Sequence, residues 1–273
     1  MLKKKLNNQT EIPMLGLGVF RTPDGDENAR AVSWAIEAGY RHVDTASVYG
    51  NEKSTGRGIH ESGVNRNELF ITTKLWNDDM RNHVQKEAFY RSLEKLGLDY
   101  IDLYLIHWPV METLEESWGV LEELYSEKLI RAIGVSNFHK NHLQELFKFA
   151  KVMPAINQIE RHPRLTQMPL IEYCRTKNIA VEAWSPLGGD SSDILTNQTI
   201  INIGKKYNKS AAQTVIRWDL QSDVVVIPKS VHKERIKANI DVFDFELSDE
   251  DMKTIDRLNQ NHRFSADPDN FDF

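Results

Sequence analysis

The chain contains 273 residues, of which 40% are hydrophobic and 27% are charged, and its formal net charge at pH 7 is −6. This length allows a sizeable core, and the negative charge disfavours nucleic acid or an acidic membrane surface as the main partner. The single cysteine, Cys174, excludes an intramolecular disulfide framework and a thiolate metal cluster.

The first residues are basic, but no apolar run follows them, so we do not expect a signal peptide. No segment approaches the roughly 18 to 20 consecutive apolar residues of a membrane span. The chain also lacks low-complexity stretches and linkers. We therefore expect a soluble, cytoplasmic protein in which residues 1–273 form a single domain.

The predicted elements begin with a hairpin at about 4–14, with two asparagines at its turn. A short strand follows at 15–20. Residues 26–38 carry apolar side chains at helical spacing, and Gly39 ends this predicted helix. After the hairpin, strand and helix therefore begin to alternate.

This alternation continues to residue 258. Further strands are predicted at 40–43, 69–73, 100–106, 130–135, 155–159, 179–184 and 224–227. Further helices are predicted at 51–62, 80–96, 114–126, 140–150, 168–177, 197–207, 211–221, 233–239 and 249–258. Two capping-box patterns, Thr113-x-x-Glu116 and Ser210-x-x-Gln213, indicate where two of these helices begin.

Counted from Leu15, the pattern gives eight short strands, each followed by a helix, and the strands are rich in β-branched residues, as buried parallel strands are. This count predicts an α/β fold, a (β/α)8 TIM barrel with an N-terminal β-hairpin and two additional helices. The alternative is a doubly wound sheet. It would normally carry a glycine-rich dinucleotide loop, and Gly16-x-Gly18 lacks the third glycine.

Polar residues recur where the predicted strands end, which is where TIM barrels carry their active sites. Taken one at a time, a buried Asp–Lys pair, a histidine after an apolar strand and a tyrosine in a loop are more often structural. Because all of them lie at the same end of consecutive predicted strands, a functional site is favoured. The residues at these ends are Asp44, Tyr49, Lys74, His107, Ser136, Asn137, Gln158, Trp184, Ser185, Lys229 and Ser230.

Four of these residues suit the reduction of a carbonyl group. A phenol with a pKa of about 10 donates its proton poorly at neutral pH, and a neighbouring Lys74 would lower the pKa of Tyr49. Asp44 would hold Lys74 charged and in place. His107 could orient the carbonyl group and stabilise developing charge on its oxygen.

None of these side chains can supply a hydride, which predicts a nicotinamide cofactor. Ser136, Asn137 and Gln158 are assigned to its carboxamide, and Trp184 to the face of its ring. A structural interpretation of two of them is equally open: Asn137 as a helix cap and Trp184 as a core residue.

The last predicted unit offers a phosphate site. Lys229 and Ser230 precede a helix N-terminus, where backbone N–H groups favour anions. Arg235 could bind the same anion with its planar guanidinium group. A solvated basic helix face is the alternative, but these three groups together favour a 2′-phosphate and hence NADPH.

Four long motifs carry a family resemblance: Gly39 to Glu52, Leu98 to Pro109, Ile133 to Phe138, and Ile227 to Asn239. On these motifs the chain resembles the aldo-keto reductases from Leu15 to its tail. It is most similar to the bacterial branch that includes 2,5-diketo-gulonate reductases and glyoxal or methylglyoxal reductases. Trp184, where many animal members have tyrosine, supports that branch.

The resemblance implies a barrel that binds NADP(H), with Tyr49 as the acid of a tetrad completed by Asp44, Lys74 and His107. It implies substrate contacts by Phe20, Trp76, His107 and Trp108. It also implies cofactor contacts by Ser136, Asn137, Gln158, Trp184, Ser185, Leu187, Lys229, Ser230, Val231, Arg235 and Asn239. Ala238 departs from the pattern, because many members place an acidic or amide residue there against the adenine.

We therefore expect a monomeric, NADPH-dependent reductase of small aldehydes and ketones that needs no metal. The tail at 259–273, including Pro268 to Phe271, is expected to fold over the pocket. The alternative function is a non-catalytic NADPH-binding protein that senses redox state. A barrel hydrolase would need paired acidic groups or metal ligands at the strand ends, which Asp44 beside Lys74 does not offer.

Overall fold

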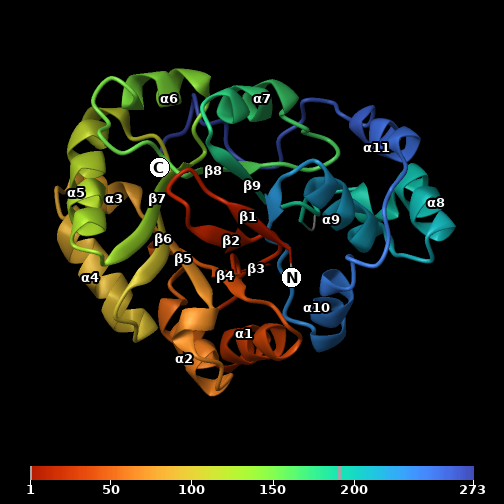
Figure 1. The fold of residues 1–273 in the computed structure, drawn as a ribbon, viewed down its shortest axis with the longest axis horizontal. Helices are drawn as coiled ribbons and strands as arrows, with labels where there is room; N and C mark the ends of the chain where they lie inside the picture. The colour runs from red at the N-terminus through yellow and green to blue at the C-terminus, as the bar shows by residue number, and fades with distance from the viewer. Residues whose placement is uncertain (1, 190–191) are drawn as a thin grey trace.

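The computed structural model describes residues 2–189 and 192–273. Eight parallel strands form a curled sheet surrounded by helices (Figure 1), as the sequence predicts. In sheet order, which is also chain order, the strands are β3 (Leu17–Gly18), β4 (His42–Asp44), β5 (Phe70–Leu75), β6 (Ile101–Ile106), β7 (Ile130–Ser136), β8 (Ile156–Glu160), β9 (Ala180–Trp184) and β10 (Val225–Val226).

Two glycines allow the first and last strands to meet. Gly16 N donates a hydrogen bond of 2.9 Å to Val226 O, and Gly18 forms a parallel bridge with Lys229. A Cβ atom on Gly16 would lie 2.5 Å from His42 Nδ1, and one on Gly18 would lie 2.8 Å from the Ile227 carbonyl oxygen. The Gly-x-Gly pattern therefore serves close packing where the barrel closes.

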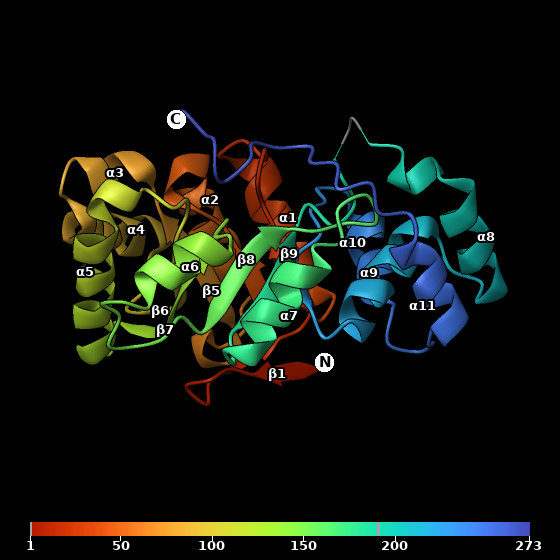
Figure 2. The same ribbon diagram turned by 90° about the horizontal axis from the view of Figure 1, so that it is seen from above.

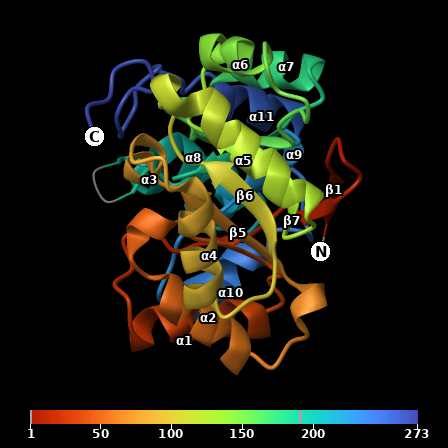
Figure 3. The same cartoon turned by 90° about the vertical axis from the view of Figure 1, so that its left-hand side faces the viewer.

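The N-terminal hairpin covers the end of the barrel opposite the strands' C-terminal ends. It consists of β1 (Lys3–Lys5) and β2 (Glu11–Pro13). Leu6 and Ile12 are buried in a cluster with residues from six barrel strands, including Phe70 and Leu103. Figures 2 and 3 place β1 on one side of the barrel and the C-terminal tail on the other.

The helices surround the barrel in the expected alternation. They are α1 (Asp26–Glu37), α2 (Glu52–Glu61), α3 (Asn77–Arg81), α4 (Gln85–Leu96), α5 (Leu114–Ser126), α6 (Lys140–Leu146), α7 (Met168–Thr176), α8 (Gln198–Lys206), α9 (Ala211–Gln221), α10 (Lys233–Ile240) and α11 (Asp249–Asp256). Among the described residues, no helix is both long and apolar enough to cross a membrane.

Two local predictions are wrong. The helix expected at 80–96 is divided into α3 and α4, because His83 between them adopts a left-handed conformation with φ of 57°. The capping box at Thr113 does not form: Thr113 ends a 3-10 turn, and its buried hydroxyl finds no partner among the described residues. The box at Ser210 is confirmed, since Ser210 and Gln213 bond reciprocally.

A second, smaller core lies outside the barrel. Helices α8, α9 and α11 pack together, with Trp218 of α9 fully buried among isoleucines from α8 and α11. The single cysteine, Cys174 of α7, is also fully buried, and its Sγ accepts a 3.8 Å hydrogen bond from Asn157 Nδ2. Burial raises the pKa of the Cys174 thiol to about 11.

Candidate active site

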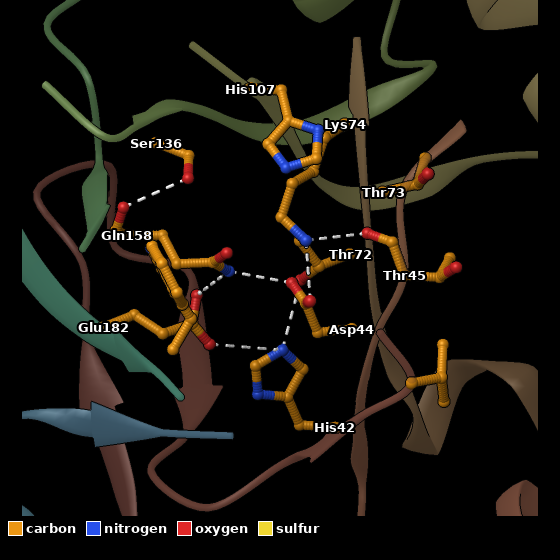
Figure 4. Close-up of polar contacts among 12 residues, drawn as sticks. His42, Asp44, Thr45, Thr72, Thr73, Lys74, His107, Ser136, Gln158 and Glu182 are labelled. Atoms are coloured by element: carbon orange, nitrogen blue, oxygen red, sulfur yellow. Dashed lines mark hydrogen bonds and ion pairs between the residues drawn. The ribbon is translucent and has the colours of Figure 1, made fainter. Parts of the chain in front are cut away.

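A buried ion pair lies where β4 and β5 end. Lys74 Nζ is 2.6 Å from Asp44 Oδ1 and donates a second hydrogen bond of 2.8 Å to the carbonyl oxygen of Thr45 (Figure 4). Lys74 is 0% exposed and Asp44 is 2% exposed. The β4–β5 register places Asp44 opposite Thr72, so that Lys74 follows two residues later on the same face of its strand.

Tyr49 and His107 lie next to this pair. Tyr49 ends a 3-10 turn, Ser47–Tyr49, and its ring centroid is 5.1 Å from Lys74 Nζ. The His107 ring lies 5.7 Å from the Tyr49 ring at an interplanar angle of 73°. The backbone of His107 is fixed by a 3.1 Å hydrogen bond from its N–H to Leu75 O. The structure thus brings together all four residues that the sequence assigned to catalysis.

The electrostatics differ from the sequence prediction in one respect. Burial raises the pKa of Tyr49 by more than the charge of Lys74 lowers it, so the phenol is a weaker acid than in water, not a stronger one. Burial acts to lower the pKa of Lys74, but Asp44 and Tyr49 outweigh it and the net shift is upward. Burial and Lys74 both lower the pKa of His107, which is therefore neutral at pH 7.

A lower layer of buried polar groups supports the pair. Gln158 Nε2 donates hydrogen bonds to Asp44 Oδ2 at 2.8 Å and to Glu182 Oε2 at 2.9 Å (Figure 4). His42 Nε2 lies 3.1 Å from the hydroxyl of Thr72. The sequence prediction missed Glu182 and His42. For Glu182 the sequence did offer a signal, because a charged residue stands in the middle of the apolar strand predicted at 179–184.

The groups assigned to the nicotinamide carboxamide are bonded to one another. Ser136 Oγ donates to Gln158 O, and Asn137 Nδ2 donates to His107 O at 3.0 Å. Trp184 Nε1 donates to Asn137 Oδ1 at 2.9 Å. Asn137 is not a helix cap: its φ is 63°, and α6 begins at Lys140 after His139. Trp184 is only partly buried, so it is not a core residue either.

The phosphate-site residues surround the start of α10. Lys229 and Arg235 are exposed, and neither forms an ion pair with any described residue. By contrast, Lys233 lies 3.7 Å from a carboxylate oxygen of Glu37. Ser230 is buried, and its hydroxyl accepts a hydrogen bond from His232 N. Of the other assigned residues, Asn239 is buried, whereas Ser185, Leu187 and Val231 are partly buried.

Aromatic rings extend outward from Tyr49. Phe20 lies 4.9 Å from the Tyr49 ring, and Trp76 lies 5.2 Å from the His107 ring. The tail completes this set. Phe273 stacks on Trp76 at an interplanar angle of 3° and meets Trp108 edge-on, and Phe271 also contacts Trp108. The predicted pocket residues are thus connected to the tail.

Asp269 anchors the tail at the start of α6. Its carboxylate lies 2.6 Å from His139 Nδ1, 3.2 Å from His142 Nε2 and 3.0 Å from Asn141 Nδ2. Two histidines and a carboxylate could hold a metal ion. However, His142 Nδ1 accepts from a backbone N–H and His139 Nε2 accepts from Arg263. Both rings therefore direct N–H groups, not lone pairs, at Asp269.

Residues 14–260 match the model of the aldo/keto reductase family.

The chain belongs to the aldo/keto reductase family.

This aldo/keto reductase is 55% identical over 267 residues to a protein of Trypanosoma cruzi named 9,11-endoperoxide prostaglandin H2 reductase, covering 97% of this chain and 94% of that one. It is 52% identical to the glyoxal reductase of Bacillus subtilis, over 97% and 95% of the two chains. The structure of a Bombyx mori aldo-keto reductase in complex with NADP matches this structure with a TM-score of 0.91 and 39% sequence identity. The match covers 98% of this chain and 96% of that one.

These comparisons confirm the predicted family, the barrel and the cofactor. The aldo/keto reductase is an NADPH-dependent oxidoreductase that acts on carbonyl groups. All three relatives are named as reductases, and none supports the redox-sensing alternative.

Proposed function

We propose that this enzyme reduces small, reactive aldehydes and ketones, such as glyoxals and sugar-derived carbonyl compounds, and that Tyr49 donates the proton. The observation that carries this proposal is the buried Asp44–Lys74 pair, whose ammonium group lies 5.1 Å from the centroid of the Tyr49 ring. His107 lies beside the same ring.

NADPH, when bound, supplies the hydride. Because burial raises the pKa of Tyr49, its phenol stays protonated and ready to donate across the neutral pH range. Lys74 acts when the proton leaves, since its charge stabilises the phenolate that develops in the transition state. Asp44 holds Lys74 in place, and neutral His107 can donate a hydrogen bond to the carbonyl oxygen without giving up a proton.

The residues present fit an NADPH molecule at both of its ends. Lys229 and Arg235 offer exposed cations without an ion-pair partner among the described residues, which suits a 2′-phosphate. Ser230, Val231 and Asn239 complete that end in the proposal. The nicotinamide end takes Ser136, Asn137 and Gln158 for the carboxamide, Trp184 for the ring, and Ser185 and Leu187 beside them.

The substrate pocket in this proposal is lined by Phe20, Trp76 and Trp108, together with the tail residues Phe271 and Phe273. These rings lie within 6 Å of a neighbouring ring in one continuous series that begins at Tyr49. An aromatic wall around a single acid suits small carbonyl compounds. The name of the Bacillus relative supports glyoxals as the first substrates to test.

The test is the oxidation of NADPH, followed by absorbance, with glyoxal, methylglyoxal, sugar ketones and aromatic aldehydes as substrates. We expect the highest kcat/KM with the small dicarbonyls. The variant Tyr49→Phe should have a turnover about 10²–10⁴-fold lower, because general acid catalysis contributes that much. Its affinity for NADPH should be unchanged. Near-normal turnover by this variant would contradict the role of Tyr49.

We also propose that the enzyme is a cytoplasmic monomer in which residues 1–273 form a single domain, with the hairpin at about 4–14 and the tail at about 259–273 as extensions. The negative charge and the single buried cysteine support this proposal. Light scattering coupled to size-exclusion chromatography should give a mass near the 31.5 kDa of one chain. A mass of twice this value would contradict it.

A further inference from the structure

A second carboxyl group lies below the proposed catalytic residues, and the mechanism above does not use it. Glu182 is in the middle of β9 and is fully buried. The strand register pairs it with Gln158 on one side and with Val225 on the other. Because Gln158 Nε2 also donates to Asp44, a single amide group connects the two carboxyl groups (Figure 4).

Within the part of the chain that the structure describes, no lysine or arginine forms an ion pair with Glu182. The ammonium group of Lys74 is bonded to Asp44. His42 Nε2 is 3.6 Å from Glu182 Oε1, but burial lowers the pKa of His42 to about 3, so its ring is neutral. Val225, on the adjacent strand, is apolar. The buried group thus contains one cation and two carboxyl groups, and an unpaired buried carboxylate is costly.

The charge of Glu182 acts on the proposed acid and on its partner. An ionised Glu182 raises the pKa of Tyr49 and also that of Lys74. Burial, followed by the charge of Asp44, raises the pKa of Glu182 itself to about 8. As pH rises through this value, Glu182 loses its proton and Tyr49 becomes a weaker proton donor.

We propose that Glu182 is a positioning residue, which holds a proton below the site. Through Gln158 and Asp44, an uncharged Glu182 leaves the charge of Lys74 unopposed when Tyr49 gives up its proton to the carbonyl oxygen. This inference rests on the proposed role of Tyr49 as the acid. The groups that face Glu182 are Asp44 and His42 from β4, Lys74 from β5 and Gln158 from β8.

The experiment compares variants of Glu182 by the pH profile of kcat/KM for glyoxal, between about pH 6 and about pH 10. Glu182→Gln keeps hydrogen-bonding groups and Glu182→Met keeps the approximate volume, but neither can ionise. In both variants we expect the decline of kcat/KM at alkaline pH to begin about one unit or more higher than in the wild type. Glu182→Asp, which retains a carboxyl group, should keep the decline near its wild-type position.

Asp102→Asn is the matched control. Asp102 is also a buried carboxyl group on a barrel strand with a raised pKa, but it contacts Arg66 and Arg131 and belongs to no part of the proposed site. This variant should leave the pH profile unchanged. An unchanged profile in the Gln and Met variants, or an equal shift in the Asp variant, would overturn the proposal.

A second measurement detects the proton itself. Infrared difference spectra recorded over the same pH range should show the loss of a protonated-carboxyl band at a pKa of about 8 in the wild-type enzyme but not in Glu182→Gln. The band of Asp219, another buried carboxyl group whose pKa burial raises to about 7, should be common to both. The absence of any band specific to the wild type would overturn the inference. A wild-type enzyme that shows the band but reduces no aldehyde would instead contradict the proposed function.

Discussion

The Asp44–Lys74 pair and the Lys229–Arg235 region place cations in the same barrel in opposite ways. Lys74 is fully buried and bonded to a carboxylate and a carbonyl oxygen. Lys229 and Arg235 are exposed and have no ion-pair partner among the described residues. The first arrangement is fixed before any ligand arrives, as electrostatic catalysis requires. The second must order two long side chains when an anion binds, which costs conformational entropy.

The largest effect is expected from breaking the buried pair. Lys74→Met leaves Asp44 buried without its cation, so we expect the free energy of unfolding to fall by about 3–5 kcal/mol. Turnover should fall by about 10²-fold or more, because Tyr49 loses the charge that stabilises its phenolate. Urea unfolding and NADPH oxidation measure the two quantities.

The double variant Lys74→Met with Asp44→Asn separates stability from activity. Removal of both charges should restore much of the free energy of unfolding, because no unpaired ion remains buried. Activity should not return. Recovery of turnover in the double variant would show that the pair has only a structural role.

An intermediate effect is expected at the exposed cations. Arg235→Ala should raise the KM for NADPH by about tenfold or more, since a hydrogen bond to a charged group contributes about 1.5–3 kcal/mol. The KM for NADH and the stability should change little. Lys237→Ala, an exposed lysine on the same helix, is the control. Equal losses with NADPH and NADH would argue against a 2′-phosphate contact.

The smallest effect is expected at the tail. The Asp269 side chain is 51% exposed, so its ion pairs with His139 and His142 are weak. Asp269→Asn should raise the KM for aldehydes by roughly two- to fivefold, as contacts worth about 0.2–1 kcal/mol each are lost, and leave kcat nearly unchanged. Asp272→Asn, an exposed change in the same tail, should have no effect.

The barrel was predictable because strand and helix periodicities are local properties of the sequence. The four proposed catalytic residues were also predictable, since strand ends on one side of a barrel must converge. Features that depend on single backbone angles were not: neither glycine nor proline marks the break at His83, and the 3-10 turn before α5 moved Thr113 away from a capping geometry.

The sign of the Tyr49 shift and the place of Glu182 required the folded structure. The sequence predicts that Lys74 lies near Tyr49. The upward shift in the pKa of Tyr49, however, is set mainly by burial, which depends on the tertiary packing around the ring. Similarly, Asp269 and His139 are 130 positions apart, so no local pattern could indicate their contact.

The burial of Cys174 has a consequence for the chemical durability of the enzyme. The dicarbonyl substrates proposed above react with thiolates, and a reductase that meets them at every turnover is exposed to self-modification. Its single thiol is fully buried, and a pKa of about 11 keeps it protonated. Lys74, the amine of the proposed catalytic site, is likewise held in its charged form, which cannot condense with an aldehyde. The fold thereby withholds two of its nucleophiles from its own substrates.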